Sequence, residues 1–223
     1  MLEELCRFDT CTLADALETF DVRLRNQGYT RHGLRCLSGN FPPVAGFAVT
    51  ARVRSSDPPM LGRSYVNHDE WWRDFERVPR PRIVVIQDVD PDPGTGACIG
   101  QLAAAIFQAL DCVAAVTNGA VRDLPAIAEL RLPVFACHVS PSHSYAHIVD
   151  HGQPVEVRGL LVQASDVLVA DQHGVLSIPA ELVPALPAAA GEICQRKRNF
   201  VDFCRSGEFS LDRLREELRH LKP

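Results

Sequence analysis

The sequence lacks the features that mark membrane, secreted or nucleic-acid-binding proteins. It has no uninterrupted apolar run of about 18 residues, so no membrane-spanning helix is expected. Its formal net charge of −5 provides no general attraction to nucleic acid or to anionic membranes. The first ten residues carry acidic side chains early and contain no apolar segment of the secretory kind. We therefore expect a cytoplasmic protein that binds neither membranes nor nucleic acid.

Several motifs of metal sites and nucleophilic enzymes are also absent. Eight cysteines are present, but none forms a Cys-x-x-Cys pair and no metal-type spacing is repeated. We expect reduced thiols that are mostly buried as small apolar groups. Neither Gly-x-Ser-x-Gly nor His-Glu-x-x-His occurs, which argues against a serine hydrolase of that type and against the corresponding zinc proteases.

What the chain does contain is an ordinary globular composition. Of its 223 residues, 46% are hydrophobic and 23% are charged, which is enough apolar material for a substantial core. No internal repeat and no low-complexity segment is found. We interpret residues 1–223 as a single domain.

The first third of the chain predicts a helix, a long strand and a second helix. Residues 8–20 have an Asp or Thr cap and apolar side chains on one helical face. Residues 44–55 alternate well enough for a strand with one wetter face. Residues 56–80 are polar and hold both tryptophans, and we interpret them as an excursion that contains a helix. Trp72 and Phe75 are expected to pack from this helix onto the body of the protein.

The middle of the chain alternates between buried strands and helices. Residues 82–88 form a β-branched run typical of a buried strand, and a helix is expected at about 99–110. Two further apolar runs, 113–116 and 133–139, predict strands on either side of the turn at 117–119 and a short helix. This alternation is typical of an α/β fold.

The character of the sequence changes after residue 139. Residues 140–152 are polar and rich in histidine, and we interpret them as a solvated loop. Residues 153–178 contain three short strand candidates separated by turns, which predict a small β-rich layer over the α/β part. Residues 180–221 are expected to form helices with a break near 206–207, and the last of these helices is amphipathic.

Two charged side chains stand where the α/β pattern defines the chain geometry well. Arg122 and Asp123 follow a strand and a tight turn and precede a helix. An arginine there can fork onto a carboxylate, and an aspartate can hold a hard cation. If the sheet is parallel, the glycine-rich loop 94–101 emerges at the same rim, and its amides bind the carboxylate from a second side. The plainer alternative is an aspartate that only caps the helix beside a surface arginine.

Two other interpretations have weaker support. Gly94, Gly96 and Gly100 lie between a strand and a helix, as in a dinucleotide site, but the connection is long and contains two prolines. A zinc site would use His143 and His147, four residues apart, but the surrounding sequence does not favour a helix. Hydrogen-bonding loop residues are the plainer interpretation, and a catalytic or ligand role stays open for His138, His143, His147, His151 and His173.

Several blocks of sequence together resemble the RraA-like family. They are NGAVRD at 118–123, PVFA at 133–136 and DVLVADQHGVLSIP at 166–179, and FDTCTLADAL and VAGFAVTARV resemble the family's first helix and strand. The family includes 4-hydroxy-4-methyl-2-oxoglutarate aldolases, oxaloacetate decarboxylases and the regulator of ribonuclease activity A. The resemblance covers most of the chain. It implies an α-β-β-α sandwich of the swivelling-domain type with C-terminal helices, assembled as a homotrimer or hexamer with sites at subunit boundaries.

The resemblance also implies roles for individual residues. Asp123 would hold Mg²⁺ or Mn²⁺, and Arg122 would contact the pyruvate-like part of a small 2-oxoacid. The substrate carboxylate would be bound by the backbone of Gly100, Gln101, Leu102 and Ala103. A cation chelated by the keto and carboxylate oxygens is an electron sink, so retro-aldol cleavage or decarboxylation would leave a stabilised pyruvate enolate.

One departure from the family pattern concerns proton transfer. Family aldolases carry an acid 21 positions before the arginine, where this chain has Gln101, and other members carry one three positions after the metal-site aspartate, where it has Ala126. Glutamine orients water but does not accept a proton, so a histidine or Glu192 of a neighbouring subunit would have to act. Two functions stay open. One is a lyase-like enzyme with Arg122 and Gln101 as candidate catalytic residues, and the other is a catalytically altered, protein-binding regulator.

Overall fold

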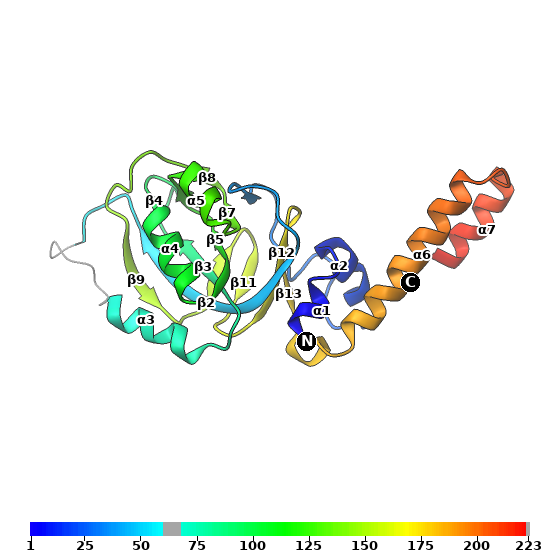
Figure 1. Cartoon of the computed structure of the whole chain (residues 1–223), viewed down its shortest axis with the longest axis horizontal. Coiled ribbons are helices and arrows are strands. Elements are labelled where there is room, and N and C mark those ends of the chain that lie inside the picture. Colours follow the sequence, from blue (N-terminus) through cyan, green and yellow to red (C-terminus); the bar gives the residue numbers. More distant parts are fainter. Residues whose placement is uncertain (60–67, 222–223) are drawn as a thin grey trace.

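The computed structural model describes residues 1–59 and 68–221 of the chain. Its centre is an eight-stranded sheet in the order β1-β7-β5-β3-β2-β12-β13, with β9 paired to a further part of β2 (Figure 1). These strands are β1 (Arg35–Cys36), β2 (Val44–Arg54), β3 (Arg82–Asp88), β5 (Cys112–Thr117), β7 (Val134–Ala136), β9 (His147–His151), β12 (Val167–Asp171) and β13 (Gly174–Ile178). The predicted α/β class is confirmed.

Helices precede, interrupt and follow these strands. They are α1 (Leu2–Leu5), α2 (Thr10–Glu18), α3 (His68–Arg77), α4 (Gln101–Ala109), α5 (Leu124–Leu130), the 3₁₀ turn η1 (Ala180–Leu182), α6 (Leu186–Arg205) and α7 (Leu211–Leu221). The predicted cap of α2 is confirmed, since the Asp9 carboxylate accepts a hydrogen bond from the Thr12 amide at 2.6 Å. The predicted break near 206–207 separates α6 from α7.

Four neighbouring strands of the sheet, β2, β3, β5 and β7, are mutually parallel. Nearly every residue of β3 and β5 is buried, as expected for strands covered on both faces. Because the strands are parallel, β3 and β5 end at the same edge of the sheet, at Asp88 and Thr117. This edge is called the carboxyl rim below, and it is where ligands bind in many α/β folds.

A second, three-stranded parallel sheet stands at the carboxyl rim. It consists of β4 (Ala97–Ile99), β6 (Ala120–Val121) and β8 (His138–Val139). The prediction of one strand over 133–139 is therefore wrong, because the chain leaves the main sheet after β7 and pairs with β6 as β8. The His138 amide donates to the Gly119 carbonyl at 3.2 Å, so the turn after β5 supplies the new partner.

One face of the main sheet carries an aromatic core. Alternate residues of β2 and β3 point to this face and pack against α3, α4 and α5. The buried aromatic side chains are Trp71 and Phe75 of α3 and Phe107 of α4. Phe75 is buried as predicted, but Trp71, at 5% exposure, is the deeply buried indole, and Trp72 packs against this core only partly buried.

The opposite face is covered by a β-hairpin. β10 (Val155–Val157) pairs antiparallel with β11 (Leu160–Val162), and alternate hairpin residues pack against the main sheet. This hairpin is the predicted small β-rich layer. The prediction is wrong for β12 and β13, which extend the main sheet beyond β2 by antiparallel pairing.

A loop was predicted for the histidine-rich residues 140–152, and this prediction is wrong for their second half. Its second half forms β9, which pairs antiparallel with the end of β2 from Ala51↔His151 to Arg54↔His147. Ile148 of β9 is 5% exposed and belongs to the aromatic core. The pairing partner lies about a hundred residues earlier in the chain, so the local polarity did not reveal the strand.

The far end of the sheet is covered by a third group of helices. α1, α2 and the first part of α6 pack over β12 and β13. α6 then extends away from the sheet, and α7 folds back beside its outer end (Figure 1). Phe209, in the connection between these two helices, packs against Phe203 of α6, with ring centroids 5.6 Å apart. The main sheet, the second β layer and the helices that cover them agree with the predicted fold class. No described helix is long and apolar enough to cross a membrane.

The hairpin provides a stability test with a matched control. Leu160 is 2% exposed and its neighbour Leu161 is 62% exposed. We expect Leu160→Ala to lower the free energy of unfolding by about 2–5 kcal/mol, because it removes buried methyl groups and leaves a cavity. Leu161→Ala should change it by less than about 1 kcal/mol. Urea denaturation measures both, and equal losses would contradict the packing described for this hairpin.

Candidate functional site

The turn after β5 is tied to the end of β3 at the carboxyl rim. The Asp88 amide donates to Asn118 Oδ1 at 2.7 Å, and Asn118 Nδ2 donates to the Asp88 carbonyl at 2.9 Å. Asn118 is the first residue of the NGAVRD segment. This pair of bonds therefore sets where the segment that contains Arg122 and Asp123 begins.

Two buried acids hold the loop between β3 and β4. The Asp88 carboxylate accepts from the amides of Asp90 at 3.0 Å and Gly94 at 2.8 Å. The Asp90 carboxylate accepts from the backbone amides and hydroxyls of Ser55 and Ser56, at 2.7–3.0 Å. The loop that precedes α4 is thus anchored to the ends of β2 and β3, which the sequence did not indicate.

The surroundings shift the pKa values of these two acids in opposite directions. Burial raises the pKa of the Asp88 carboxyl, and the negative charge of the neighbouring Asp90 raises it further. The hydrogen bonds from the Asp90 and Gly94 amides lower it, but by less. Burial also acts to raise the pKa of Asp90, but the hydrogen bonds from Ser55 and Ser56 outweigh it and lower that pKa. Asp90 is therefore the acid that folding keeps ionised.

The predicted site residues Gly100, Gln101, Arg122 and Asp123 come together at the start of α4. Asp123 Oδ2 lies 3.2 Å from the Gln101 amide nitrogen and 3.3 Å from Arg122 Nε. A Cβ atom on Gly100 would stand 2.8 Å from the same oxygen and 3.1 Å from Arg122 Cγ. A glycine at position 100 is therefore what allows the carboxylate to approach the helix.

Asp123 stands in the N-cap position of α5 but does not cap that helix. Its backbone is left-handed, with φ 57° and ψ 34°, and its side chain makes no cap hydrogen bond. Aspartate tolerates this conformation better than most residues. The carboxylate is turned toward α4 instead, so the plainer interpretation of Asp123 as a helix cap is wrong.

The first turn of α4 presents backbone donors beside this carboxylate. The first intrahelical bond runs from the Ala104 amide to the Gly100 carbonyl at 3.0 Å, so the three preceding amides have no acceptor within the helix. Gln101 donates to Asp123, and within the described chain the amides of Leu102 and Ala103 have no acceptor. A helix start of this kind favours an anion.

Asp123 fits a hydrated hard cation better than an ion enclosed by protein ligands. Its side chain is 38% exposed, and no described residue donates a hydrogen bond to its Oδ1. The described residues contain no group of three or more His, Cys, Asp or Glu side chains that would ligate a metal. Mg²⁺ is commonly bound through one or two carboxylates with several waters, so one carboxylate beside substrate oxygens is a suitable donor set.

The residues considered for proton transfer lie in different places. The Gln101 side chain is exposed in the first turn of α4, and Ala126 is half-buried one turn after Asp123. Glu192 is exposed on α6, which covers the opposite end of the sheet (Figure 1). Within a single chain Glu192 therefore does not reach the site, and its action from a neighbouring subunit stays a prediction.

The five candidate histidines do not converge on one point. His138 packs over Gly94, and His143 Nδ1 bonds the Ser144 carbonyl at 2.8 Å. His147 and His151 lie on β9, where His147 Nδ1 donates to the Tyr145 carbonyl and His151 pairs with Asp74 of α3. His173 contacts Asp171 at the far end of the sheet. This spread does not form a zinc site.

A cysteine nucleophile is not supported near the rim. Cys98 of β4 lies between Thr117 Oγ1 at 3.6 Å and the Ala120 carbonyl at 3.7 Å. Burial raises the pKa of its thiol to about 12, so the thiol is protonated at neutral pH.

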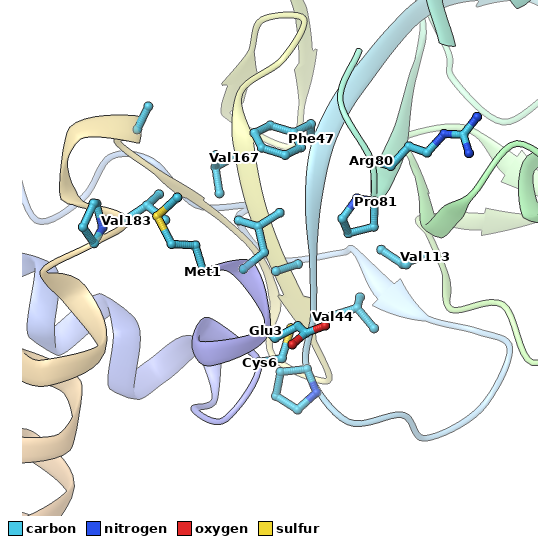
Figure 2. A pocket seen from close by; sticks show the side chains of 15 residues that line it. Met1, Glu3, Cys6, Val44, Phe47, Arg80, Pro81, Val113, Val167 and Val183 are labelled. Carbon is cyan, nitrogen blue, oxygen red and sulfur yellow. The ribbon is translucent and has the colours of Figure 1, made fainter. Parts of the chain in front are cut away.

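A large apolar cavity lies elsewhere, between α1 and the sheet (Figure 2). Its volume is about 770 Å³, and Phe47 forms part of one wall. Arg80 lines it but extends its guanidinium away and pairs with Asp111 at 3.0 Å. Glu3 is the other charged side chain that lines it. None of the predicted site residues lines this cavity.

Comparison with known proteins assigns the family. The model of the RraA-like family (Aldolase/RraA) matches residues 10–177, which include residues 100–103, Arg122 and Asp123. The chain belongs to the RraA-like family. This family includes both aldolase or decarboxylase enzymes, some of them magnesium-dependent, and inhibitors of RNA processing.

Solved structures agree on the fold at low sequence identity. An uncharacterized protein from Pseudomonas syringae pv. tomato str. DC3000 superposes with a TM-score of 0.73 at 20% identity, over 96% of this chain and 92% of that one. RraAS2 from Streptomyces coelicolor, an unusual member of the RNase ES inhibitor RraA family, gives 0.69 at 21% identity, over 88% and 93%. The RNA-processing inhibitor RraA from Thermus thermophilis gives 0.53 at 18% identity, over 74% and 92%.

The lowered pKa of Asp90 predicts a pH-dependent contribution to stability. Folding favours its ionised form, so this contribution is present above the ordinary pKa of 3.8 and is lost as the pH falls through the lowered value. We expect Asp90→Asn to reduce the free energy of unfolding by about 1–3 kcal/mol at neutral pH. The reduction should shrink below about pH 4.

Urea denaturation at about pH 7, 5 and 3 measures this difference. The exposed loop residue Asp92 is the control, since Asp92→Asn removes the same charge without removing buried hydrogen bonds. A loss for Asp90→Asn that is the same at pH 3 and pH 7 would contradict the assignment.

Proposed function

We propose that this protein is a divalent-metal-dependent lyase that acts on a small 2-oxo-carboxylic acid. The reaction is cleavage or decarboxylation at a carbon–carbon bond, of the 4-hydroxy-4-methyl-2-oxoglutarate or oxaloacetate type. One observation carries this proposal: the Asp123 carboxylate contacts both Arg122 and the first turn of α4. Its Oδ2 lies 3.3 Å from Arg122 Nε and 3.2 Å from the Gln101 amide nitrogen. Family membership supports the class of reaction.

The binding of the substrate carboxylate is assigned to the first turn of α4 and to Arg122. The backbone of residues 100–103 provides donors at a helix start, where an anion is favoured. Arg122 is 34% exposed and bonds Asp123 through Nε only, so its terminal nitrogens remain able to reach a ligand. An arginine fork beside backbone amides holds a planar carboxylate in a defined orientation.

Asp123 is assigned to the cation, Mg²⁺ or Mn²⁺. When bound, such an ion supplies Lewis-acid stabilisation of the negative charge that develops on the 2-oxoacid. Arg122 stabilises the same charge from its side of the site, as a pyruvate enolate forms in either reaction. Because Arg122 already pairs with Asp123, the positions of the guanidinium and the carboxylate are coupled.

Gln101 is assigned to water positioning. Gln101 lies at the helix start, where its backbone amide is 3.2 Å from Asp123 Oδ2, and its side-chain amide group donates and accepts hydrogen bonds but does not take up a proton. Proton transfer then falls to the bound water itself or to a group from a neighbouring subunit. This assignment predicts slow turnover, because general acid–base catalysis typically contributes about 10²–10⁴-fold.

The alternative function is a protein-binding regulator that has kept the fold. Gln101 and Ala126, in place of the family's acids, favour it. One structurally similar protein is described as an RNA-processing inhibitor, and another as an unusual member of the RNase ES inhibitor RraA family. In that case the surface around α4 would serve for partner recognition, and the Arg122–Asp123 pair would be structural.

We also propose that the single RraA-like domain spans residues 1–223 and assembles as a homotrimer or hexamer in the cytoplasm. Members of the family are oligomeric. Exposed apolar side chains near the rim support an interface there, with Leu102 at 80%, Val139 at 59% and Tyr145 at 53% exposure.

Removal of the proposed metal ligand separates the two functions. We expect Asp123→Ala to lower Mg²⁺- or Mn²⁺-stimulated pyruvate release from a 2-oxoacid by at least about 100-fold, since it removes stabilisation of the developing charge. Glu129→Ala removes an exposed acid of α5 and should leave the rate unchanged. A coupled pyruvate assay measures both variants. Equal rates for Asp123→Ala and the native protein would reject the lyase proposal, and retained partner binding without metal-stimulated turnover would favour the regulator.

Restoring a carboxyl group at position 101 tests the role of Gln101. We expect Gln101→Asp to raise the turnover number for retro-aldol cleavage or decarboxylation by about ten-fold or more, because a carboxylate can exchange a proton with the ordered water. Gln101→Asn is the matched control, with the same size as the aspartate but no proton-transfer group. A turnover number that is equal in the two variants would argue against missing proton transfer as the limiting step.

A further inference from the structure

A second pocket lies beside the candidate site, between α3, α4 and the start of β9. Its volume is about 220 Å³. Aromatic rings form much of its wall: Trp71 and Trp72 are stacked with centroids 4.7 Å apart, and Trp71 meets Phe107 edge-on at 5.9 Å. An apolar cavity of about 150 Å³ holds a benzene molecule, so this pocket has room for a branched alkyl or phenyl group.

The pocket adjoins the proposed carboxylate site through the first turn of α4. Ala103 belongs to both, since its amide is one of the proposed donors and its side chain lines the pocket. Cys98 also lines the pocket, two residues before Gly100. Ile106 continues the wall along α4. A ligand held at the helix start therefore has an apolar space next to it.

The lining is suited to an uncharged group. The described residues around the pocket include no lysine, arginine or acid. The Cys98 thiol is protonated at neutral pH, and Nδ1 of the lining residue His147 is occupied by its bond to the Tyr145 carbonyl at 2.6 Å. Among the described lining residues, a second substrate carboxylate, as oxaloacetate carries, would lose its hydration without gaining a lysine or arginine partner.

We propose that this pocket binds the apolar side group of the 2-oxoacid whose carboxylate is held at the start of α4. The inference rests on the lyase class of the proposed function and replaces its dicarboxylic substrates. The substrate is then a monocarboxylic 4-hydroxy-2-oxoacid with a branched alkyl or aryl group, cleaved by the retro-aldol reaction, and the pocket between α3 and α4 determines that preference. In retro-aldol cleavage the bond between C3 and C4 breaks and its electron pair goes to the pyruvate enolate. The 4-hydroxyl loses its proton to water and becomes the carbonyl of the second product, and the enolate takes up a proton, so no further reactant is needed.

The two tryptophans of the chain make the pocket observable, because both line it. Tryptophan fluorescence therefore reports its occupation, and isothermal titration calorimetry gives the affinity independently. The probes are pyruvate and 4-methyl-2-oxopentanoate, each titrated into the full-length protein with Mg²⁺. We expect 4-methyl-2-oxopentanoate to bind at least about ten-fold more tightly, since one buried methylene already changes affinity by about ten-fold or more. It should also give the larger fluorescence change.

The same substitution, alanine to phenylalanine, is made once inside the pocket and once outside it. Ala146 lines the pocket just before β9, and Ala109 is exposed at the end of α4 outside it. Ala146→Phe fills the pocket and should remove the ten-fold preference while leaving pyruvate affinity unchanged. Ala109→Phe should preserve the preference. Ala146→Leu adds less volume and serves if Ala146→Phe does not fold, as judged by thermal unfolding.

The outcomes distinguish this inference from the proposed function. Equal affinities for the two acids, or equal effects of the two Ala→Phe variants, would overturn the pocket assignment while Asp123-dependent pyruvate release still supported a lyase. If Ala146→Phe changes the size of the oligomer but keeps the ten-fold preference for 4-methyl-2-oxopentanoate, the pocket belongs to a subunit interface and the pocket assignment is wrong. If neither acid binds and no pyruvate is released, both proposals fail.

Discussion

The approach of the Asp123 carboxylate to the first turn of α4 is the contact on which the candidate site depends. Parallel pairing of β4 with β6 brings the two segments together, and the Arg122 amide donates to the Ile99 carbonyl at 3.0 Å. Gly100 then leaves room for the carboxylate, and the left-handed backbone of Asp123 turns it away from its own helix. The result is a partly exposed ion pair beside helix amides, on which we base the proposed binding of a carboxylate and a cation together.

The frame beneath this contact is held by buried hydrogen bonds. Asp88 and Asn118 join the ends of β3 and β5, and Asp90 joins the loop before β4 to the end of β2. Buried carboxylates are tolerated at this depth because backbone amides and hydroxyls satisfy them. Because the backbone of the rim is held in this way, it sets the positions of the exposed side chains, and a few of them are enough to form the site.

Much of the fold was predictable from the sequence, because buried strands and amphipathic helices leave local patterns. The strand at 82–88 and the helix that begins near Gly100 are examples, and the glycine-rich loop and the Arg122–Asp123 pair were identified as neighbours by assuming a parallel sheet. The three-stranded sheet was missed because its strands are only two or three residues long and leave no periodicity. β9 was missed because its polar sequence becomes a strand only by pairing with β2. The roles of the site residues in catalysis stay predictions.

The sequence by itself determined the α/β alternation, the family and the chemical groups available for a site, since these follow from residue types and their order. Tertiary structure decided what Asp123 does: the same residue at a helix start would cap α5 if its backbone were extended, and only the nearby first turn of α4 gives its carboxylate another donor. It also decided that Trp71 rather than Trp72 is deeply buried, and that the aromatic pocket lies next to Ala103. These features depend on contacts between segments far apart in the chain, which no local pattern contains.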